Sequence, residues 1–211
     1  MLTFFYSTQT CSTAVHIALE EAGIPFQGVE VSWKRKVNVD ELTAVNPLGQ
    51  VPALVSDGHA IIQSSAILEY IADHAKGKNL LPAAGTWERT QAQVWMAFIA
   101  ADFQKSFAPL FWASRWTSDT ATQTAIKKTS LENIEKYLGY IDHALTGKEY
   151  ILGKQFTVVD AFLFTITAWC KWSEIKISQH SNLTAYMKRV YARPAVQKVL
   201  AKEEMLDCLP S

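Results

Sequence analysis

Short apolar runs and helical patterns alternate along the N-terminal part of the chain. Leu2–Tyr6 is an aromatic-rich run bounded by polar turn formers, which is typical of a buried strand. From Ser12 the apolar positions recur at helical spacing, and Gly23 with Pro25 marks where this helix ends. Phe26–Ser32 then resumes an alternating strand pattern. We therefore expect a strand, a helix and a second strand in this order.

The next residues predict two more strands and two more helices. Asp57-Gly58 separates the apolar runs Val51–Val55 and His59–Ile62, and this dipeptide is the strongest short signal for a hairpin. A short helix is expected over Asp40–Val45, and a longer one over Ser64–His74. The predicted order of elements is β-α-β-α-β-β-α.

Pro52 stands where one of these strands begins. A proline has no amide hydrogen to donate to the strand ladder, so its place there needs a reason. One explanation is a cis peptide bond between Val51 and Pro52. The other is an ordinary trans proline at the first residue of the strand.

After a linker the chain shows only helical patterns. Residues 77–86 are rich in glycine, proline and small side chains, without a period. The helices expected beyond them are Trp87–Phe107, with an interruption at Pro109, and then Thr120–Leu145, Ala161–Trp172, Leu183–Ala192 and Ala195–Lys202. We therefore expect an α/β domain at 1–76, a linker at 77–86 and an all-α helical domain at 87–211.

Composition and charge exclude several classes of partner. Twenty basic residues balance twenty acidic ones, so no net field attracts nucleic acid or an anionic membrane. The one basic cluster, Lys34-Arg35-Lys36, is expected to be a solvated loop. The five histidines show no metal-ligand spacing, and no glycine-rich phosphate loop is present, so neither a metal nor a nucleotide cofactor is expected.

Cysteine usage and the N-terminus indicate a cytoplasmic protein. The three cysteines are an odd number at unrelated spacings, which argues against a disulfide framework and fits a reducing compartment. The first residues form no secretory signal, and no apolar run is long enough to cross a bilayer. We expect Cys170 and Cys208 to be buried and chemically inert.

Candidate chemistry begins at Thr10-Cys11-Ser12, which enters the first predicted helix. The unpaired N–H groups and dipole of a helix start stabilise an anion, including a thiolate of the protein or of a ligand. The alternative is that Cys11 is a small, partly buried residue without a chemical role. Thr157 and Asp160 form a second conspicuous motif, but their spacing predicts a structural capping box.

Four stretches together carry a family resemblance: Tyr6–Ser12, Asn46–Leu54, Gln63–Ile67 and Phe156–Ala161. In this order and at these separations the chain resembles the cytosolic glutathione transferases over essentially its whole length, and the bacterial beta class most closely. The resemblance implies a thioredoxin-like first domain that binds glutathione. It also implies a helical-bundle second domain that supplies a hydrophobic substrate pocket. Glutathione would be a cosubstrate, with no permanently bound cofactor.

In the first domain, the resemblance implies that Cys11 and the adjacent Ser12 are catalytic. It also implies a cis Val51-Pro52 bond, with the Val51 backbone pairing with the cysteinyl backbone of glutathione. The glutathione-binding residues of this domain would be Lys34 for the glycyl carboxylate, Val51 and Pro52, and Gln63 and Ser64 for the γ-glutamyl end. Other classes use a tyrosine in this region to polarise the sulfur, whereas in the beta-class pattern Tyr6 is a core aromatic.

In the second domain, the resemblance implies that Gln104 and Lys105 lie beside the sulfur and that Asp102 reaches the glutathione of a partner subunit. Beta-class members often carry a histidine at the position of Gln104, which forms hydrogen bonds but cannot change charge. Lys105 either favours a thiolate by its charge or is a solvated helix residue. The expected wall for a hydrophobic electrophile is aromatic: Phe107, Phe111, Trp112 and Trp116.

Three functions follow as hypotheses. The first is a homodimeric glutathione transferase, in which the thiol of bound glutathione attacks small hydrophobic electrophiles, as in detoxification. The second is a glutathione-dependent thiol–disulfide oxidoreductase or peroxidase in which Cys11 is the nucleophile. The third is a non-catalytic ligand-binding or scaffold protein on the same fold.

Overall fold

A mixed four-stranded sheet organises the N-terminal part of the computed structural model, which describes residues 1–211. The strands lie in the order β2-β1-β3-β4, with bounds β1 Leu2–Tyr6, β2 Phe26–Glu30, β3 Ala53–Ser56 and β4 His59–Ile62. β1 is parallel to β2 and antiparallel to β3, which pairs antiparallel with β4. This is the thioredoxin-like topology that the sequence predicts.

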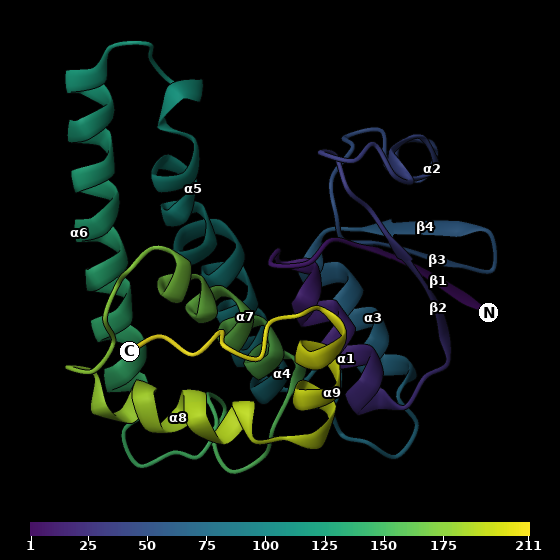
Figure 1. Cartoon of the computed structure of the whole chain (residues 1–211). Coiled ribbons are helices and arrows are strands. Elements are labelled where there is room, and N and C mark those ends of the chain that lie inside the picture. The colour runs from purple at the N-terminus through teal and green to yellow at the C-terminus, as the bar shows by residue number, and fades with distance from the viewer.

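Helices cover both faces of this sheet (Figure 1). α1 (Ser12–Ala22) packs with α3 (Ser64–His74) on one face, and α2 (Val39–Val45) lies on the other. The alternation of β1 explains this arrangement, because successive side chains of a strand point to opposite faces. Phe4 belongs to the large core beneath α1 and α3, whereas Phe5 packs with Leu42 in a small core beneath α2.

The turn residues behave as their chemistry predicts. Gly23 closes α1 in the left-handed conformation at φ 65°, and its N–H donates to the Glu20 carbonyl. The hairpin between β3 and β4 turns at Asp57 and Gly58, both with positive φ. The Val51–Pro52 peptide bond is cis, which confirms the first of the two explanations for Pro52.

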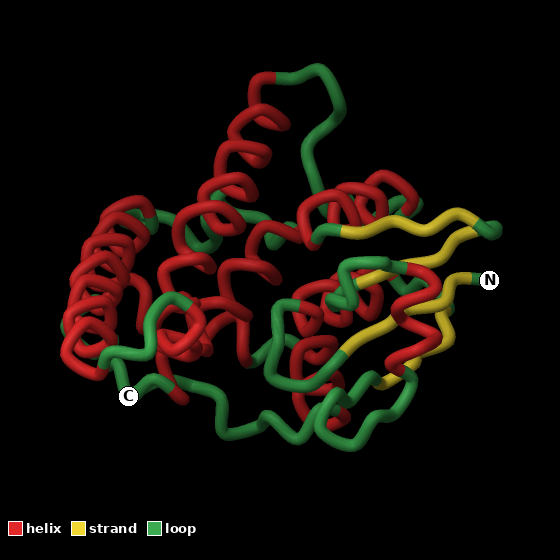
Figure 2. Tube along the Cα trace, turned by 90° about the horizontal axis from the view of Figure 1, so that it is seen from above, coloured by secondary structure: helices red, strands yellow, loops and turns green.

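The remainder of the chain is helical, and the strands are confined to one end of the molecule (Figure 2). The elements are α4 Trp87–Phe98, the π-helical turn η1 Ile99–Phe103, α5 Gln104–Trp112, the 3-10 turn η2 Ala113–Arg115, α6 Thr120–Ala144, α7 Val158–Trp172, α8 Ser181–Tyr191 and α9 Pro194–Lys202. In length and hydropathy, none of these helices meets the requirements of a membrane span.

One prediction for this region is wrong in detail. The sequence predicts one regular helix over Trp87–Phe107 that is interrupted at Pro109, but the helical path continues through Pro109 to Trp112. The irregularity lies earlier, in the π turn that joins α4 to α5. Proline removes one backbone donor without preventing a helix when the surrounding packing holds the turn.

α7 runs through the centre of the helical part, and every residue from Val158 to Cys170 is buried. Its start is fixed by the predicted capping box, in which an Asp160 carboxylate oxygen accepts from the Thr157 amide at 2.8 Å. The other oxygen accepts from the Ile151 amide at 2.9 Å and from the Tyr186 hydroxyl at 3.2 Å. Burial nevertheless raises the pKa of Asp160 to about 6, because desolvation outweighs these hydrogen bonds.

Side chains of α1 tie the N-terminal part to the C-terminal end of the chain. Arg193 forms a two-pronged ion pair with Glu21, with N–O distances of 2.6 and 2.9 Å. The buried Glu203 carboxylate accepts from the Thr13 hydroxyl and pairs with His16 Nδ1, both at 2.6 Å. The helix that carries Cys11 at its first turn is therefore held in place from its far side.

Candidate active site

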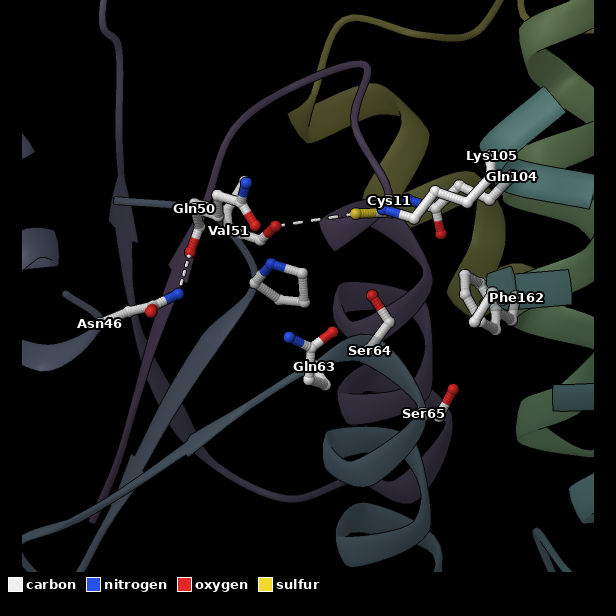
Figure 3. Close-up of a pocket in the computed structure, with 12 residues that line it drawn as sticks. Cys11, Asn46, Gln50, Val51, Gln63, Ser64, Ser65, Gln104, Lys105 and Phe162 are labelled. Carbon is white, nitrogen blue, oxygen red and sulfur yellow. Dashed lines mark hydrogen bonds between the residues drawn. The ribbon is translucent and has the colours of Figure 1, made fainter. Parts of the chain in front are cut away.

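A cavity opens where the N-terminal α/β part meets α5 and α7 (Figure 3). Its walls come from the start of α1, from the loop before β3, from the start of α3 and from the helical part. The lining residues are Cys11, Asn46, Gln50, Val51, Pro52, Gln63, Ser64, Ser65, Ala100, Gln104, Lys105 and Phe162. Seven of the residues predicted for the site are among them: Cys11, Val51, Pro52, Gln63, Ser64, Gln104 and Lys105.

The Cys11 thiol lies at the first turn of α1 and faces this cavity. Its Sγ donates to the Val51 carbonyl oxygen at 3.7 Å (Figure 3). The polar side chains of Ser64 and Gln104 and the positive charge of Lys105 each lower the pKa of the Cys11 thiol, so three groups favour a thiolate. Burial outweighs them and raises the pKa of the Cys11 thiol above its ordinary value. Near pH 7 Cys11 is therefore a neutral thiol in the free protein.

The loop before β3 presents backbone groups to the cavity. Asn46 is buried and holds this loop, because its side chain donates to the Gln50 carbonyl at 2.7 Å and accepts from the Leu48 amide at 3.1 Å. The cis bond before Pro52 follows directly, so the Val51 backbone faces the cavity. An extended peptide can pair with such an edge through main-chain hydrogen bonds.

The start of α3 supplies an anion-binding corner. Gln63 precedes the helix in a left-handed conformation at φ 74°, and no side chain caps the first turn. The first-turn N–H groups are thus free for a ligand, and Gln63, Ser64 and Ser65 all line the cavity there. A carboxylate is the kind of ligand group that this corner binds.

Three of the predicted residues of the site lie elsewhere. Ser12 is fully buried, and its hydroxyl accepts from the Ser7 amide at 3.1 Å and donates to the Ser7 carbonyl at 3.0 Å. It shapes the loop before Cys11, and does not reach the cavity. Lys34 is exposed in the loop after β2. Asp102 is exposed in a second hollow, between α5 and α6, which Lys105 also lines.

The four predicted aromatic wall residues separate into two groups. Phe107 has no exposed surface and packs in the core against Trp169, with ring centres 5.7 Å apart. Its prediction as a ligand contact is therefore corrected to a core role. Phe111, Trp112 and Trp116 are 39%, 44% and 56% exposed, which is unusual for side chains of this size.

Sequence reasoning missed five lining residues. Asn46, Gln50 and Ser65 lie inside the motifs that carried the resemblance, so their place could have been inferred. Ala100 and Phe162 gave no signal, because each lies in an ordinary apolar stretch of a helix. Tyr6 is buried beside His16, with ring centres 5.1 Å apart, and is a core aromatic as predicted.

Comparisons with known proteins identify the family of the chain. Residues 3–73 match the glutathione S-transferase N-terminal domain, and residues 101–203 match the C-terminal domain of the same family. Glutathione S-transferase GstA of Escherichia coli O157:H7 is 36% identical over 94% of this chain and 97% of its own.

Solved structures give the same result. The beta-class glutathione S-transferase of Sphingomonas chungbukensis is 37% identical, with a TM-score of 0.86 over 96% of this chain and 99% of its own. A sphingomonad glutathione S-transferase in complex with glutathione is 33% identical, with a TM-score of 0.87 and the same coverage. The chain therefore belongs to the glutathione S-transferase family.

Proposed function

We propose that this glutathione S-transferase binds glutathione in the cavity beside Cys11 and activates its thiol for attack on small hydrophobic electrophiles. The observation that carries the proposal is that Ser64, Gln104 and Lys105 line one cavity together with Cys11 (Figure 3). Two hydrogen-bond donors and a cation are what stabilises a thiolate at neutral pH. The sulfur of a glutathione molecule bound beside Cys11 would be stabilised by the same three side chains.

The shape of the cavity supports a binding mode for the tripeptide. The Val51 backbone would pair with the cysteinyl backbone of glutathione. The γ-glutamyl carboxylate would lie at the start of α3, against Gln63 and Ser64. Lys34 is exposed outside the cavity, so it would meet the glycyl carboxylate only after its loop closes over the ligand.

The chemical step follows from the protonation states. Bound glutathione would lose its thiol proton to solvent, because Gln104 and Lys105 favour the anion, whereas Cys11 keeps its proton. The glutathione sulfur would then form a bond to an electrophilic carbon while a leaving group, such as a halide, departs with the electrons of its own bond. Cys11 would assist by donating its S–H to the thiolate.

A second candidate function uses Cys11 itself, because its sulfur faces the cavity. As a thiolate it would attack the glutathionyl sulfur of a mixed disulfide between glutathione and another thiol, forming a mixed disulfide between Cys11 and glutathione and releasing the other thiol. A reduced glutathione would then attack this mixed disulfide, leaving as oxidised glutathione and restoring the Cys11 thiol. The raised pKa of Cys11 makes this thiolate scarce at neutral pH, which is why we rank the function second.

The proposal extends to assembly, location and organisation. We propose a homodimer in which Asp102 of one subunit reaches the glutathione of the other, and a cytoplasmic role in detoxification. The division into residues 1–76, 77–86 and 87–211 is part of the same proposal. It is supported by the change from a sheet with helices to helices alone.

Calorimetric titration of glutathione, followed by conjugation assays, tests the proposed function. Wild-type protein should bind glutathione and conjugate an aryl halide, and Cys11→Ala should retain both while losing any disulfide reductase activity. Absence of binding at millimolar glutathione would instead favour the non-catalytic scaffold. Loss of conjugation in Cys11→Ala, with glutathione still bound, would favour Cys11 as the nucleophile.

A further inference from the structure

The face of α5 that lines the cavity continues beyond it as an aromatic wall. Gln104 and Lys105 belong to the cavity, and residues three, four and seven positions further along a helix share the same face. This rule places Ala108 one turn above the cavity. Phe111 and Trp112 lie two turns above it, about 10 Å along the axis.

α7 supports this wall from behind. Phe162 of α7 lines the cavity together with Gln104 of α5. Seven residues later in both helices, Trp169 and Phe111 meet with ring centres 5.8 Å apart. Trp169 therefore packs against one side of Phe111, whose side chain remains 39% exposed.

A cation without an ionic partner stands at the far end of the wall. The Arg115 guanidinium lies 4.6 Å above the Trp112 ring centre and is exposed. No carboxylate lies within ion-pair distance of it, and the same holds for Lys105. Asp119, close by in the sequence, is engaged in capping α6 through the Thr122 amide. A planar guanidinium is suited to binding a carboxylate through two hydrogen bonds.

We propose that the electrophile is a flat aromatic compound that carries an anionic group opposite its reactive carbon. Its ring would lie over Ala108 and against Phe111 and Trp112, and its carboxylate would bind Arg115. The reactive carbon would then point down to the glutathione sulfur. This inference rests on the proposed function, and it makes Arg115 the residue that selects anionic substrates.

A matched pair of substrates tests the inference: para-fluoro-meta-nitrobenzoate and the corresponding neutral benzamide. In both reactions the glutathione sulfur bonds to the ring carbon and fluoride leaves with the electrons of the carbon–fluorine bond. Dividing each enzymatic kcat/KM by the uncatalysed rate with glutathione removes the difference in intrinsic reactivity. Wild type should then prefer the benzoate, and added salt should reduce the preference because the site is exposed.

Arg115→Gln should lower kcat/KM for the benzoate about fivefold and leave the benzamide unchanged, since one exposed carboxylate contact is lost. Arg115→Lys should restore part of the preference by its charge. Lys188→Gln is the matched control, because it removes an exposed charge from α8 without touching the wall.

Two results would overturn the inference, and they differ from each other. Equal corrected rates for benzoate and benzamide in wild type, or equal losses in Arg115→Gln and Lys188→Gln, would remove Arg115 as a selecting residue while the proposed conjugation stands. If wild type bound glutathione but conjugated neither compound, the proposed function would fail and the inference with it.

Discussion

Gln104 is the residue whose replacement tests the activation of glutathione most sharply. Its side chain lines the cavity with Cys11 and lowers the pKa of the Cys11 thiol, and an amide does not titrate. Gln104→Leu keeps a side chain of similar size and removes the donor. The variant should therefore lose stabilisation of the thiolate without losing the shape of the cavity.

The size of the effect follows from the kind of hydrogen bond. A bond to a charged acceptor contributes about 1.5–3 kcal/mol, and the lower value applies here because the cavity is open to water. A loss of about 1.5 kcal/mol corresponds to about a tenfold lower kcat/KM below the thiol pKa, and to a rise of about one in the pKa of the bound thiol. The two effects should appear together.

The assay is the pH dependence of kcat/KM for a neutral aryl electrophile at saturating glutathione, which reports ionisation in the enzyme–glutathione complex. The acid limb of the Gln104→Leu profile should lie about one pH unit above that of wild type. Gln104→His should restore the donor and add a titration of its own. Ser65→Ala is the control, because Ser65 lines the cavity but lies farther from the Cys11 sulfur than Ser64 does (Figure 3). An unmoved acid limb in Gln104→Leu would refute this reasoning.

Two further predictions concern stability, measured by urea unfolding. Burial raises the pKa of Asp160 from 3.8 to about 6, so the native state holds this proton more tightly than the unfolded state. Between about pH 4 and pH 7, the free energy of unfolding of wild type should therefore fall by about 3 kcal/mol relative to that of the non-titrating Asp160→Asn. A free energy of unfolding of wild type that rises with pH relative to that of Asp160→Asn would contradict this prediction. Glu203→Ala should destabilise the protein by about 3–5 kcal/mol, because it leaves His16 and Thr13 buried without their shared acceptor. A loss below about 1 kcal/mol would show that this link is weaker than its burial implies.

The sequence was informative wherever a residue type restricts the local backbone. Gly23, Asp57-Gly58 and the Thr157–Asp160 box each specify one conformation, so the end of α1, the hairpin and the cap of α7 were predicted, although α7 begins at Val158, three residues before the predicted Ala161. The cis bond at Pro52 was one of two open explanations, and the family resemblance favoured it. Of these features, only Pro52 lines the cavity.

Distant packing could not be predicted in the same way. His16 and Glu203 are far apart in the sequence, and neither residue indicates that it has a buried partner. Phe107 and Phe111 have the same local pattern, and only the position of α7 decides that the first is buried while the second is partly exposed. Ser12 was predicted to be catalytic because it adjoins Cys11, but its hydroxyl points toward the loop before Cys11, where it forms hydrogen bonds with the Ser7 backbone.

The central claim is that the ionised sulfur in the cavity belongs to glutathione and not to Cys11. The most direct test is to titrate the ultraviolet thiolate absorbance of the enzyme–glutathione complex with pH, in wild type and in Cys11→Ala. We predict a thiolate signal that depends on added glutathione and appears near neutral pH in both proteins, since Cys11 is neutral there. A signal that is present in wild type without glutathione and absent from Cys11→Ala would contradict the claim.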